Sequence, residues 1–420
     1  MAEWPKGRLD DVAEIVMGQS PEGEACNTTG SGMPLLNGPT EFGGHHPTPV
    51  QFTTDARKLA ATGDILFCVR GSTTGKMNWA DRQYAIGRGL AAIRPKHGTE
   101  TAHYVRAVIE SGLPQLLQIA TGSTFPNVSR DQLLGMPCHL PSLSEQKRIA
   151  GILGALDDKI ELNRKMNETL EQMARALFNS WFVDFDPAHA KATGRQPVGM
   201  DKTTADLFPI SFLDSELGKI PKGWKIVPVG EAVECVGGAT PSTAETKYWE
   251  EGRHHWTTPK DFSALASPFL LDTERKLTDA GISKISSGLL PAGTLLLSSR
   301  APIGYIAIAT IPVAINQGFI ALKCNEIASN FFMLNWCKAN MAEIEGRATG
   351  TTFPEISKQN FRPISVCLPP KELMSAFTAK VSPIYGKIVA NLRQSRNLSA
   401  IRDTLLPGLL NGDIVTSTKP

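Results

Sequence analysis

The chain has 420 residues, of which 41% are hydrophobic and 20% charged, and its formal net charge is +2. This composition is typical of a globular protein with room for two cores, and no apolar run is long enough to span a bilayer. The nearly neutral charge balance neither requires nor excludes nucleic acid, but a DNA-binding protein of this kind needs its positive charge concentrated on one face or supplied by a partner.

The N-terminal segment MAEWPKGRLDD lacks the hydrophobic stretch of a signal peptide, so we expect a cytoplasmic protein. Seven cysteines are scattered among apolar neighbours without a CxxC pair. Such spacing indicates buried, reduced thiols and argues against both a disulfide framework and a structural metal site.

The first 143 residues contain β-like segments separated by Gly, Pro, Thr and basic residues. The turn GSTTGK from Gly71 resembles a phosphate-binding loop, but three residues separate its glycines where the motif has four, so we exclude a nucleotide site. Basic and small polar side chains in such turns suit contacts with phosphates and base edges, although each one alone is as well explained as a solvated surface residue. The candidate DNA-binding residues of this half are Arg70, Ser72, Thr73, Thr74, Lys76 and Arg88.

The loop TGSTFPNVS from Thr121 has a near copy, TGTTFPEIS, that begins 228 residues later at Thr349. The similarity extends beyond the loop, because GDILFCVRGSTTG matches GTLLLSSRAPIG and GQSP matches GATP at slightly different offsets. The chain therefore consists of two diverged copies of one unit. Each copy has about 200 residues, which is the size of a domain and too long for a solenoid repeat.

A long helix is predicted after each copy of the loop, over residues 144–182 and 371–413. Both segments carry two rows of mostly apolar residues at heptad spacing, and both place Asn at the same central position. A stripe of about 33 residues is roughly 50 Å long, more than a domain of this size can cover, so we expect the two helices to pair with each other. The residues expected at this seam are Leu156, Ile160, Asn163, Asn167, Leu170, Ile384, Ile388, Asn391 and Leu398.

Residues 183–222 are rich in Pro, Gly, Ala and short polar residues without a sustained period, which predicts a long connector with room for a helical turn. A connector of this length can return along the helix, so the helices can pair antiparallel. The tetrapeptide Asp184-Phe185-Asp186-Pro187 resembles a motif of amino-methyltransferases, but it lacks the second proline and the aromatic end. We interpret it as the exit from the helix.

The second β-rich segment spans residues 223–370, and a tail of residues 414–420 follows the second helix. The candidate DNA-binding residues of segment 223–370 are Lys260, Arg300 and Tyr305. The doublets His45-His46 and His254-His255 have no partner at metal-ligand spacing, so we expect solvated loop residues. No catalytic constellation can be assigned, and we predict neither a catalytic residue nor a metal site.

The stretch from Leu140 to Pro187, with TGSTFPNVS before it and GKIPKGW after it, resembles the central conserved region of type I restriction-modification specificity subunits. The resemblance covers almost the whole chain. It implies an α+β fold in which two pseudo-twofold-related target recognition domains, residues 1–143 and 223–370, are separated by an antiparallel coiled coil of the two long helices. The second helix departs from the pattern, since Glu372-Leu373 matches Glu145-Gln146 only loosely and Arg402 lies on the seam.

The resemblance also implies a non-catalytic subunit that recognises a bipartite, asymmetric target in double-stranded DNA. Its expected partners are two modification subunits that methylate adenine, and restriction subunits that join through them. It implies no cofactor on this chain, with S-adenosylmethionine, ATP and Mg on the partner subunits. Two alternatives are an orphan DNA-binding protein without a restriction partner and a coiled-coil adaptor that binds protein alone.

Antiparallel pairing would place the two reading domains at opposite ends of a rod of about 50 Å. Since one turn of DNA is about 34 to 36 Å, we expect half-site centres between one and one and a half turns apart. We also expect Asn163 to lie close to Asn391, because a polar residue in an apolar seam is costly unless it is paired.

Overall fold

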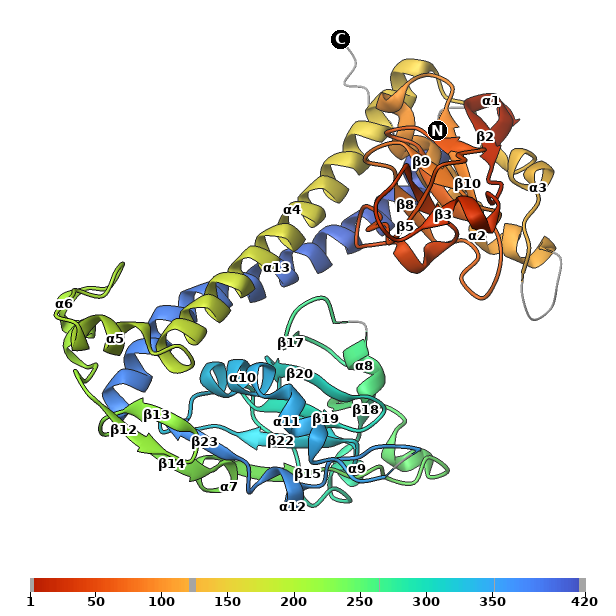
Figure 1. Ribbon diagram of the computed structural model, residues 1–420. Helices are drawn as coiled ribbons and strands as arrows, with labels where there is room; N and C mark the ends of the chain where they lie inside the picture. The colour runs from red at the N-terminus through yellow and green to blue at the C-terminus, as the bar shows by residue number, and fades with distance from the viewer. Residues whose placement is uncertain (1–3, 121–125, 264, 351, 415–420) are drawn as a thin grey trace, which may run out of the picture. The chain divides into compact units, whose positions relative to one another are not determined.

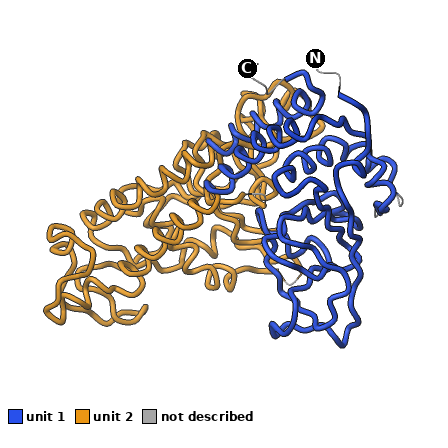
Figure 2. The backbone as a smooth tube through the Cα atoms, turned by 90° about the horizontal axis from the view of Figure 1, so that it is seen from above, with its two compact units in different colours: residues 1–163, 394–420 blue, residues 164–393 orange. Residues whose placement is uncertain are grey.

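The computed structural model describes residues 4–120, 126–263, 265–350 and 352–414 (Figure 1). The chain forms two compact units, in which unit 1 comprises residues 1–163 and 394–420 and unit 2 comprises residues 164–393 (Figure 2). The division falls inside two long helices, α4 (Leu143–Phe182) and α13 (Lys371–Asn411), so each unit contains part of both.

In its described residues, unit 1 consists mainly of short strands and has three α-helices of its own. Its strands are β1 (Lys6–Arg8), β2 (Ala13–Met17), β3 (Cys26–Asn27), β4 (Met33–Leu36), β5 (Gln51–Thr53), β6 (Leu59–Ala60), β7 (Ile65–Cys68), β8 (Met77–Trp79), β9 (Tyr84–Ile86), β10 (Leu90–Pro95) and β11 (Pro137–His139). Its helices are α1 (Leu9–Val12), α2 (Ala102–Ile119) and α3 (Arg130–Leu134). The strands form sheets in the orders β2-β10-β7-β8, β3-β5-β4-β9-β6 and β1-β11.

Unit 2 repeats this plan and adds a connector at its start. Its strands are β12 (Phe212–Ser215), β13 (Gly218–Pro221), β14 (Lys225–Pro228), β15 (Glu234–Gly237), β16 (His254–Thr257), β17 (Phe269–Leu270), β18 (Arg275–Leu277), β19 (Leu295–Ser299), β20 (Ile303–Ala309), β21 (Val313–Ile315), β22 (Phe319–Lys323) and β23 (Ser365–Leu368). Its helices are α5 (Asp186–Ala192), α6 (Lys202–Asp206), α7 (Val229–Ala232), α8 (Pro259–Ser263), α9 (Asp279–Ile282), α10 (Asn330–Ala339), α11 (Met341–Gly346) and α12 (Lys358–Phe361).

The sheets of the two units have matching topologies. The order β15-β22-β19-β20 in unit 2 corresponds strand for strand to β2-β10-β7-β8 in unit 1, and all of these neighbours are antiparallel. In both units a parallel pair, β4-β9 or β16-β21, belongs to a separate sheet. Internal duplication of one unit, which the sequence predicts, is therefore also present in the fold.

The central strands β7 and β19 are buried on both faces, which explains why their sequences are continuously apolar. In β7, Ile65 and Phe67 belong to one hydrophobic cluster, whereas Leu66 and Cys68 belong to another. Strand β19 alternates in the same way between two clusters of unit 2. The rigid part of each unit is therefore a sheet covered on both sides, and the loops at its ends are held by this frame.

The connector is more ordered than the sequence predicts. It contains α5, α6 and the hairpin β12-β13, and Lys191 Nζ donates to the carbonyl of Ala205 at 2.8 Å. Phe208 is 2% exposed, and its ring lies 5.3 Å from that of Trp181, centre to centre. Its apolar residues have no regular period because they pack individually into the core of unit 2, which is why no element could be assigned from the pattern. No helix in the described part of the chain combines the length and apolarity needed to cross a membrane.

Candidate nucleic-acid interface

Three loops that the sequence repeats lie at the same end of the main sheet in each unit. We refer to them as the GxxP loop, the hairpin turn and the FP loop. In that order they comprise residues 18–21, 69–76 and 121–129 of unit 1 and residues 238–241, 299–303 and 349–357 of unit 2. The first five residues of the FP loop in unit 1, including Phe125, and Thr351 in unit 2 lie outside the described residues.

Backbone hydrogen bonds tie the hairpin turn of unit 1 to its FP loop. The Gly71 amide donates to the Pro126 carbonyl at 3.1 Å, and the Val128 amide donates to the Val69 carbonyl at 2.9 Å. Arg70 Nε also donates to the side chain of Asn127 at 3.1 Å, although Arg70 itself is an exposed residue. Loops more than 50 residues apart in sequence therefore form one surface.

The GxxP loop completes the same surface. The Val69 amide donates to the Gly89 carbonyl at 2.9 Å, which places Arg70 and Arg88 side by side at the ends of neighbouring strands. The amide of Arg88 donates to the hydroxyl of Ser20 at 3.2 Å. Arg70 and Arg88, two predicted DNA contacts from different turns, thus lie beside the GxxP loop, which contains no predicted DNA contact.

Unit 2 repeats this arrangement with different side chains. The Ser299 amide donates to the Gly318 carbonyl at 2.8 Å and the Ile356 amide to the Ser299 carbonyl at 3.0 Å. At the position that corresponds to Arg88, Gln317 accepts a hydrogen bond from the hydroxyl of Thr240 at 2.6 Å. The three loops therefore converge in both units, and the chemistry of the surface differs between them.

The candidates of unit 1 fall into two groups. The hydroxyl of Thr74 donates to the carbonyls of Gly71 and Pro126 at 2.8 and 2.9 Å, and Thr73 lies 3.6 Å from the thiol of Cys68, so both hold the turn together. The remaining candidates project into solvent: Arg70, Ser72, Lys76 and Arg88. Within the described residues none of the three cations forms an ion pair, so this end of unit 1 is electropositive.

The candidates of unit 2 are more constrained. Arg300 Nη1 lies 3.5 Å from Glu355 Oε2, and Lys260 Nζ lies 2.9 Å from Glu274 Oε2. Tyr305 is half-buried on β20, where it packs against the hydrophobic cluster that contains Phe262. Both candidate cations of unit 2 are therefore partly neutralised, unlike the three candidate cations of unit 1.

The sequence did carry a signal for the residues that were missed. Ser20 belongs to GQSP and Thr240 to GATP, a repeated motif to which we assigned no role. Gln317 occupies the position of Arg88 in the matching segment INQGFIALKC, although its side chain is uncharged. A loop that recurs in two diverged copies is thus informative even without charge.

The long helices pair antiparallel within each unit. In unit 1, Asn163 Nδ2 donates to Gln394 Oε1 at 2.9 Å and to Ser395 Oγ at 3.2 Å. In unit 2, Asn391 Nδ2 donates to Asn167 Oδ1 at 2.9 Å. The pair Asn163–Ser395 corresponds to the pair Asn391–Asn167, since each partner is shifted by the same 228 residues.

The remaining seam candidates divide by burial. Asn163, Asn167, Ile388 and Asn391 are buried, whereas the half-buried group is Leu156, Ile160, Leu170, Ile384 and Leu398. The expected contact between Asn163 and Asn391 would join the two units, and it stays a prediction.

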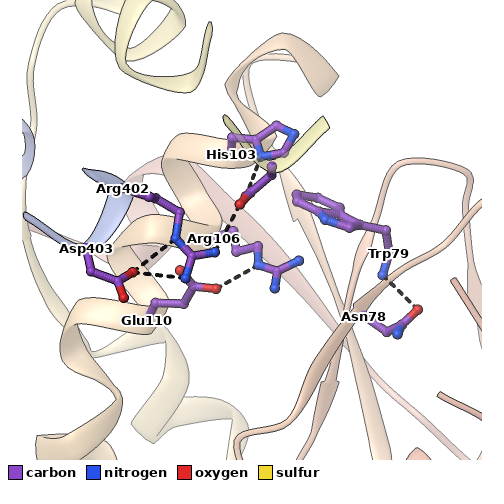
Figure 3. Close-up of polar contacts among 8 residues, drawn as sticks. Asn78, Trp79, His103, Arg106, Glu110, Arg402 and Asp403 are labelled. Atoms are coloured by element: carbon purple, nitrogen blue, oxygen red, sulfur yellow. Dashed lines mark hydrogen bonds and ion pairs between the residues drawn. The ribbon is translucent and has the colours of Figure 1, made fainter. Parts of the chain in front are cut away.

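An ionic network surrounds Arg402 in unit 1, where α13 returns to α4 (Figure 3). Arg402 Nη1 lies 3.0 Å from Asp157 Oδ1, and its Nη2 lies 3.0 Å from Asp403 Oδ1. Asp157 is also 3.5 Å from Nδ1 of His103, which lies on α2. The arginine that departs from the heptad pattern is therefore paired across the helices, with side chains that are only 26% exposed for Arg402 and 15% for Asp157.

The histidine doublets differ in their placement. His45 and His46 lie in a loop as predicted, but both are half-buried rather than solvated, and His46 Nδ1 lies 3.0 Å from the carbonyl of Trp79. The prediction of a solvated loop is wrong for His254 and His255, because they are half-buried at the start of strand β16. His254 contacts Asp279 at 2.7 Å, and His255 contacts Thr273 at 3.2 Å. The described residues contain no group of three or more His, Cys, Asp or Glu side chains arranged for a metal ion, and their seven cysteines are free thiols.

Comparisons with known proteins agree with this arrangement. The sequence profile of a family described as "Type I restriction modification DNA specificity domain" matches residues 1–172 and 221–375. The chain is 26% identical over 416 residues to the type I restriction enzyme HindI specificity subunit of Haemophilus influenzae, covering 86% of this chain and 88% of the relative. It is 24% identical over 427 residues to the type I restriction enzyme MjaIX specificity subunit of Methanocaldococcus jannaschii, covering 98% and 94%. The crystal structure of an S subunit from a type I restriction-modification system of M. genitalium has a TM-score of 0.57 at 18% identity, covering 97% of this chain and 96% of that one, which is a likeness of fold.

Proposed function

Because the chain belongs to the type I restriction modification DNA specificity family, we propose that it selects the DNA sequence on which a type I restriction-modification complex acts. Each unit reads one half of a bipartite, asymmetric target. The observation that carries this proposal is the convergence of the same three loops at the end of a rigid sheet in both units. Corresponding positions with different side chains, such as Arg88 and Gln317, suit two half-sites that differ in sequence.

The paired helices are proposed to serve the assembly of the complex in the cytoplasm. Two modification subunits bind the chain, and restriction subunits join through them. The curated relatives carry names of type I restriction enzyme specificity subunits, which supports a role beside catalytic partners. The expected cofactors, S-adenosylmethionine, ATP and Mg, belong to those partners.

The test is to map methylated adenines in DNA from cells that express the chain with its modification partner. We expect one bipartite motif with unread bases between its halves. Replacing residues 223–370 with the matching segment of a relative should change one half of the motif and leave the other intact. Methylation that does not depend on the chain, or a single undivided motif, would contradict the proposal.

Replacing Lys76 with Ala is expected to weaken binding of the assembled complex to DNA and to lower the slope of log affinity against log salt by about 1. Lys76 is exposed on the hairpin turn and is not held by an ion pair among the described residues, so it is free to reach a phosphate. The loss should be similar for specific and non-specific DNA. Lys6→Ala, an exposed lysine on β1, is the matched control, and an unchanged salt slope in Lys76→Ala excludes a phosphate contact.

The purified chain alone is expected to show no methyltransferase, nuclease or ATPase turnover. Its loops lack a phosphate-binding motif, and we assign no catalytic group to its surface. The measurement is transfer of labelled methyl groups and hydrolysis of ATP with the chain alone and with modification subunits added. Turnover by the chain alone that a point substitution within it abolishes would overturn this expectation.

A further inference from the structure

Phe353, in the FP loop of unit 2, has an unusual environment for a phenylalanine. Its side chain is 85% exposed, whereas every other phenylalanine within the described residues is buried or partly buried. A single exposed apolar side chain is common on protein surfaces, but Phe353 borders Ala301, Pro302 and Ile303, and such a contiguous apolar patch marks an interaction surface. Nothing in the fold of unit 2 requires this ring at the surface, so its placement calls for a functional explanation.

The loop that carries Phe353 is fixed at its base. Thr349 and Glu355 exchange two backbone hydrogen bonds, both of 2.9 Å, and the Ile356 amide donates to the carbonyl of Ser299 in the hairpin turn. Gly350 has a φ of +96°, a conformation that favours glycine at the start of the tight loop. The ring is therefore presented outward by a closed loop.

The surroundings of the ring are mainly apolar, with charges at the edge. Phe353 borders a hollow of about 820 Å³, lined also by Arg300, Ala301, Pro302, Ile303, Glu345, Pro354 and Glu355. Arg300 offsets the charge of Glu355 at 3.5 Å, and Lys358 is exposed in the first turn of α12. The exposed ring and the apolar residues around it suit a ligand that offers a flat apolar face, while the pairing of Arg300 with Glu355 leaves little net charge beside the ring.

We propose that Phe353 enters the DNA duplex and stacks on a base at one step of the half-site that unit 2 reads. This inference rests on the proposed recognition of DNA and assigns a specific contact to it. Stacking on an aromatic side chain tolerates any base, and phenylalanine wedges are a known means of parting a base step. A contact of this kind fits a Thr-Phe-Pro sequence that both halves keep while the hairpin turns beside it, RGSTTG and RAPIG, have diverged.

DNA is favoured over a modification subunit as the occupant because of where the loop is attached. The FP loop of unit 2 is bonded to the hairpin turn, which carries the candidate DNA contact Arg300. The long helices, which we assign to subunit assembly, contribute no residue to the lining of the hollow. The ring therefore belongs to the surface formed by the converging loops.

The test uses the chain assembled with its modification subunits and duplexes that carry 2-aminopurine at successive positions of the mapped target, excluding the methylated adenine. For the wild-type complex we expect a rise in fluorescence at one step of the half-site read by unit 2. Phe353→Ala should abolish that rise and weaken binding roughly tenfold. Phe353→Trp should retain both properties, because its larger ring can still stack.

Ile327→Ala is the matched control, since it removes another exposed apolar side chain of unit 2, 52% exposed, outside the FP loop. Unchanged fluorescence and affinity in Phe353→Ala would overturn the inference while leaving the proposed function intact. Loss of modification subunit from the Phe353→Ala complex, with normal DNA binding by the complex that remains, would also overturn it and assign the ring to protein contact. Absence of sequence-selective binding by the wild-type complex would contradict the proposed function itself.

Discussion

Seven residues inserted into each long helix are expected to lengthen the unread spacer of the DNA target by one to about three base pairs. A heptad adds about 10 Å of helix, which is about three base pairs at 3.4 Å each when the added length lies wholly along the DNA. Helices α4 and α13 each run without interruption through the boundary between the units. Insertions after Asn163 and after Arg393 would therefore leave the contacts within each unit unchanged.

The readout is the methylated motif in cells that express the altered chain. Both half-site sequences should persist, because the three converging loops of each unit are untouched. An insertion in α4 alone is the control, and it should abolish methylation because a single longer helix loses its register with the other. The same spacer after the double insertion would exclude the long helices as the element that sets the distance.

Replacing Asp157 with Ala is expected to lower the free energy of unfolding of unit 1 by about 2 to 4 kcal/mol. The substitution leaves Arg402, whose side chain is only 26% exposed, with Asp403 as its remaining ion-pair partner. It also removes the contact of Asp157 with His103 on α2, so the helix pair loses a link to the rest of unit 1. Urea unfolding of the full chain, followed by a probe in unit 1, measures the effect.

The control replaces both members of the pair. Arg402→Leu together with Asp157→Leu should cost less than Asp157→Ala alone, because no unpaired charge then lies in the seam and Asp403, which loses Arg402, is exposed to solvent. A double variant that is as unstable as Asp157→Ala would show that Asp157 acts through packing or through His103.

The same residue gives a dependence on pH. Burial raises the pKa of Asp157, but hydrogen bonds from His103 and Arg402 and the charge of Arg402 outweigh burial and hold the pKa below its ordinary value. A carboxyl with a lowered pKa stabilises the folded state above its unfolded pKa of about 4, and this stabilisation is lost as the pH falls through the folded value. The difference in stability between wild type and Asp157→Asn should therefore be full at neutral pH and shrink below about pH 4.

Elements with a long period or a repeated motif could be predicted from the sequence. The helix predicted over residues 144–182 is Leu143–Phe182, and the helix predicted over residues 371–413 is Lys371–Asn411. Many heptads reinforce one another in such a segment, so a single departure such as Arg402 does not hide the pattern. The duplication could also be predicted from the sequence, because matching loops recur at a nearly constant offset.

The parts that could not be predicted depend on which distant strands pair. The meeting of Arg70 with Arg88 follows from the register of β7 against β10, which no local pattern in either strand specifies. Asp157, the partner of Arg402 on the other long helix, is 245 residues away, and the sequence shows only that a charge lies on an apolar stripe. The ordered connector was missed because its apolar residues, such as Phe208, are isolated anchors without a period.

The division of the units inside the two long helices has a consequence for synthesis of the chain. Leu409 and Leu410, which emerge last from the ribosome, belong to the hydrophobic core of unit 1 together with Ile65 and Phe67, which emerge among the first. The core of unit 1 therefore stays partly uncovered until translation is nearly complete. Unit 2 is formed by one continuous segment and can fold first. A message that ends after Arg393 but before Leu409 would complete unit 2 and leave the core of unit 1 uncovered, prone to aggregation and open to proteases.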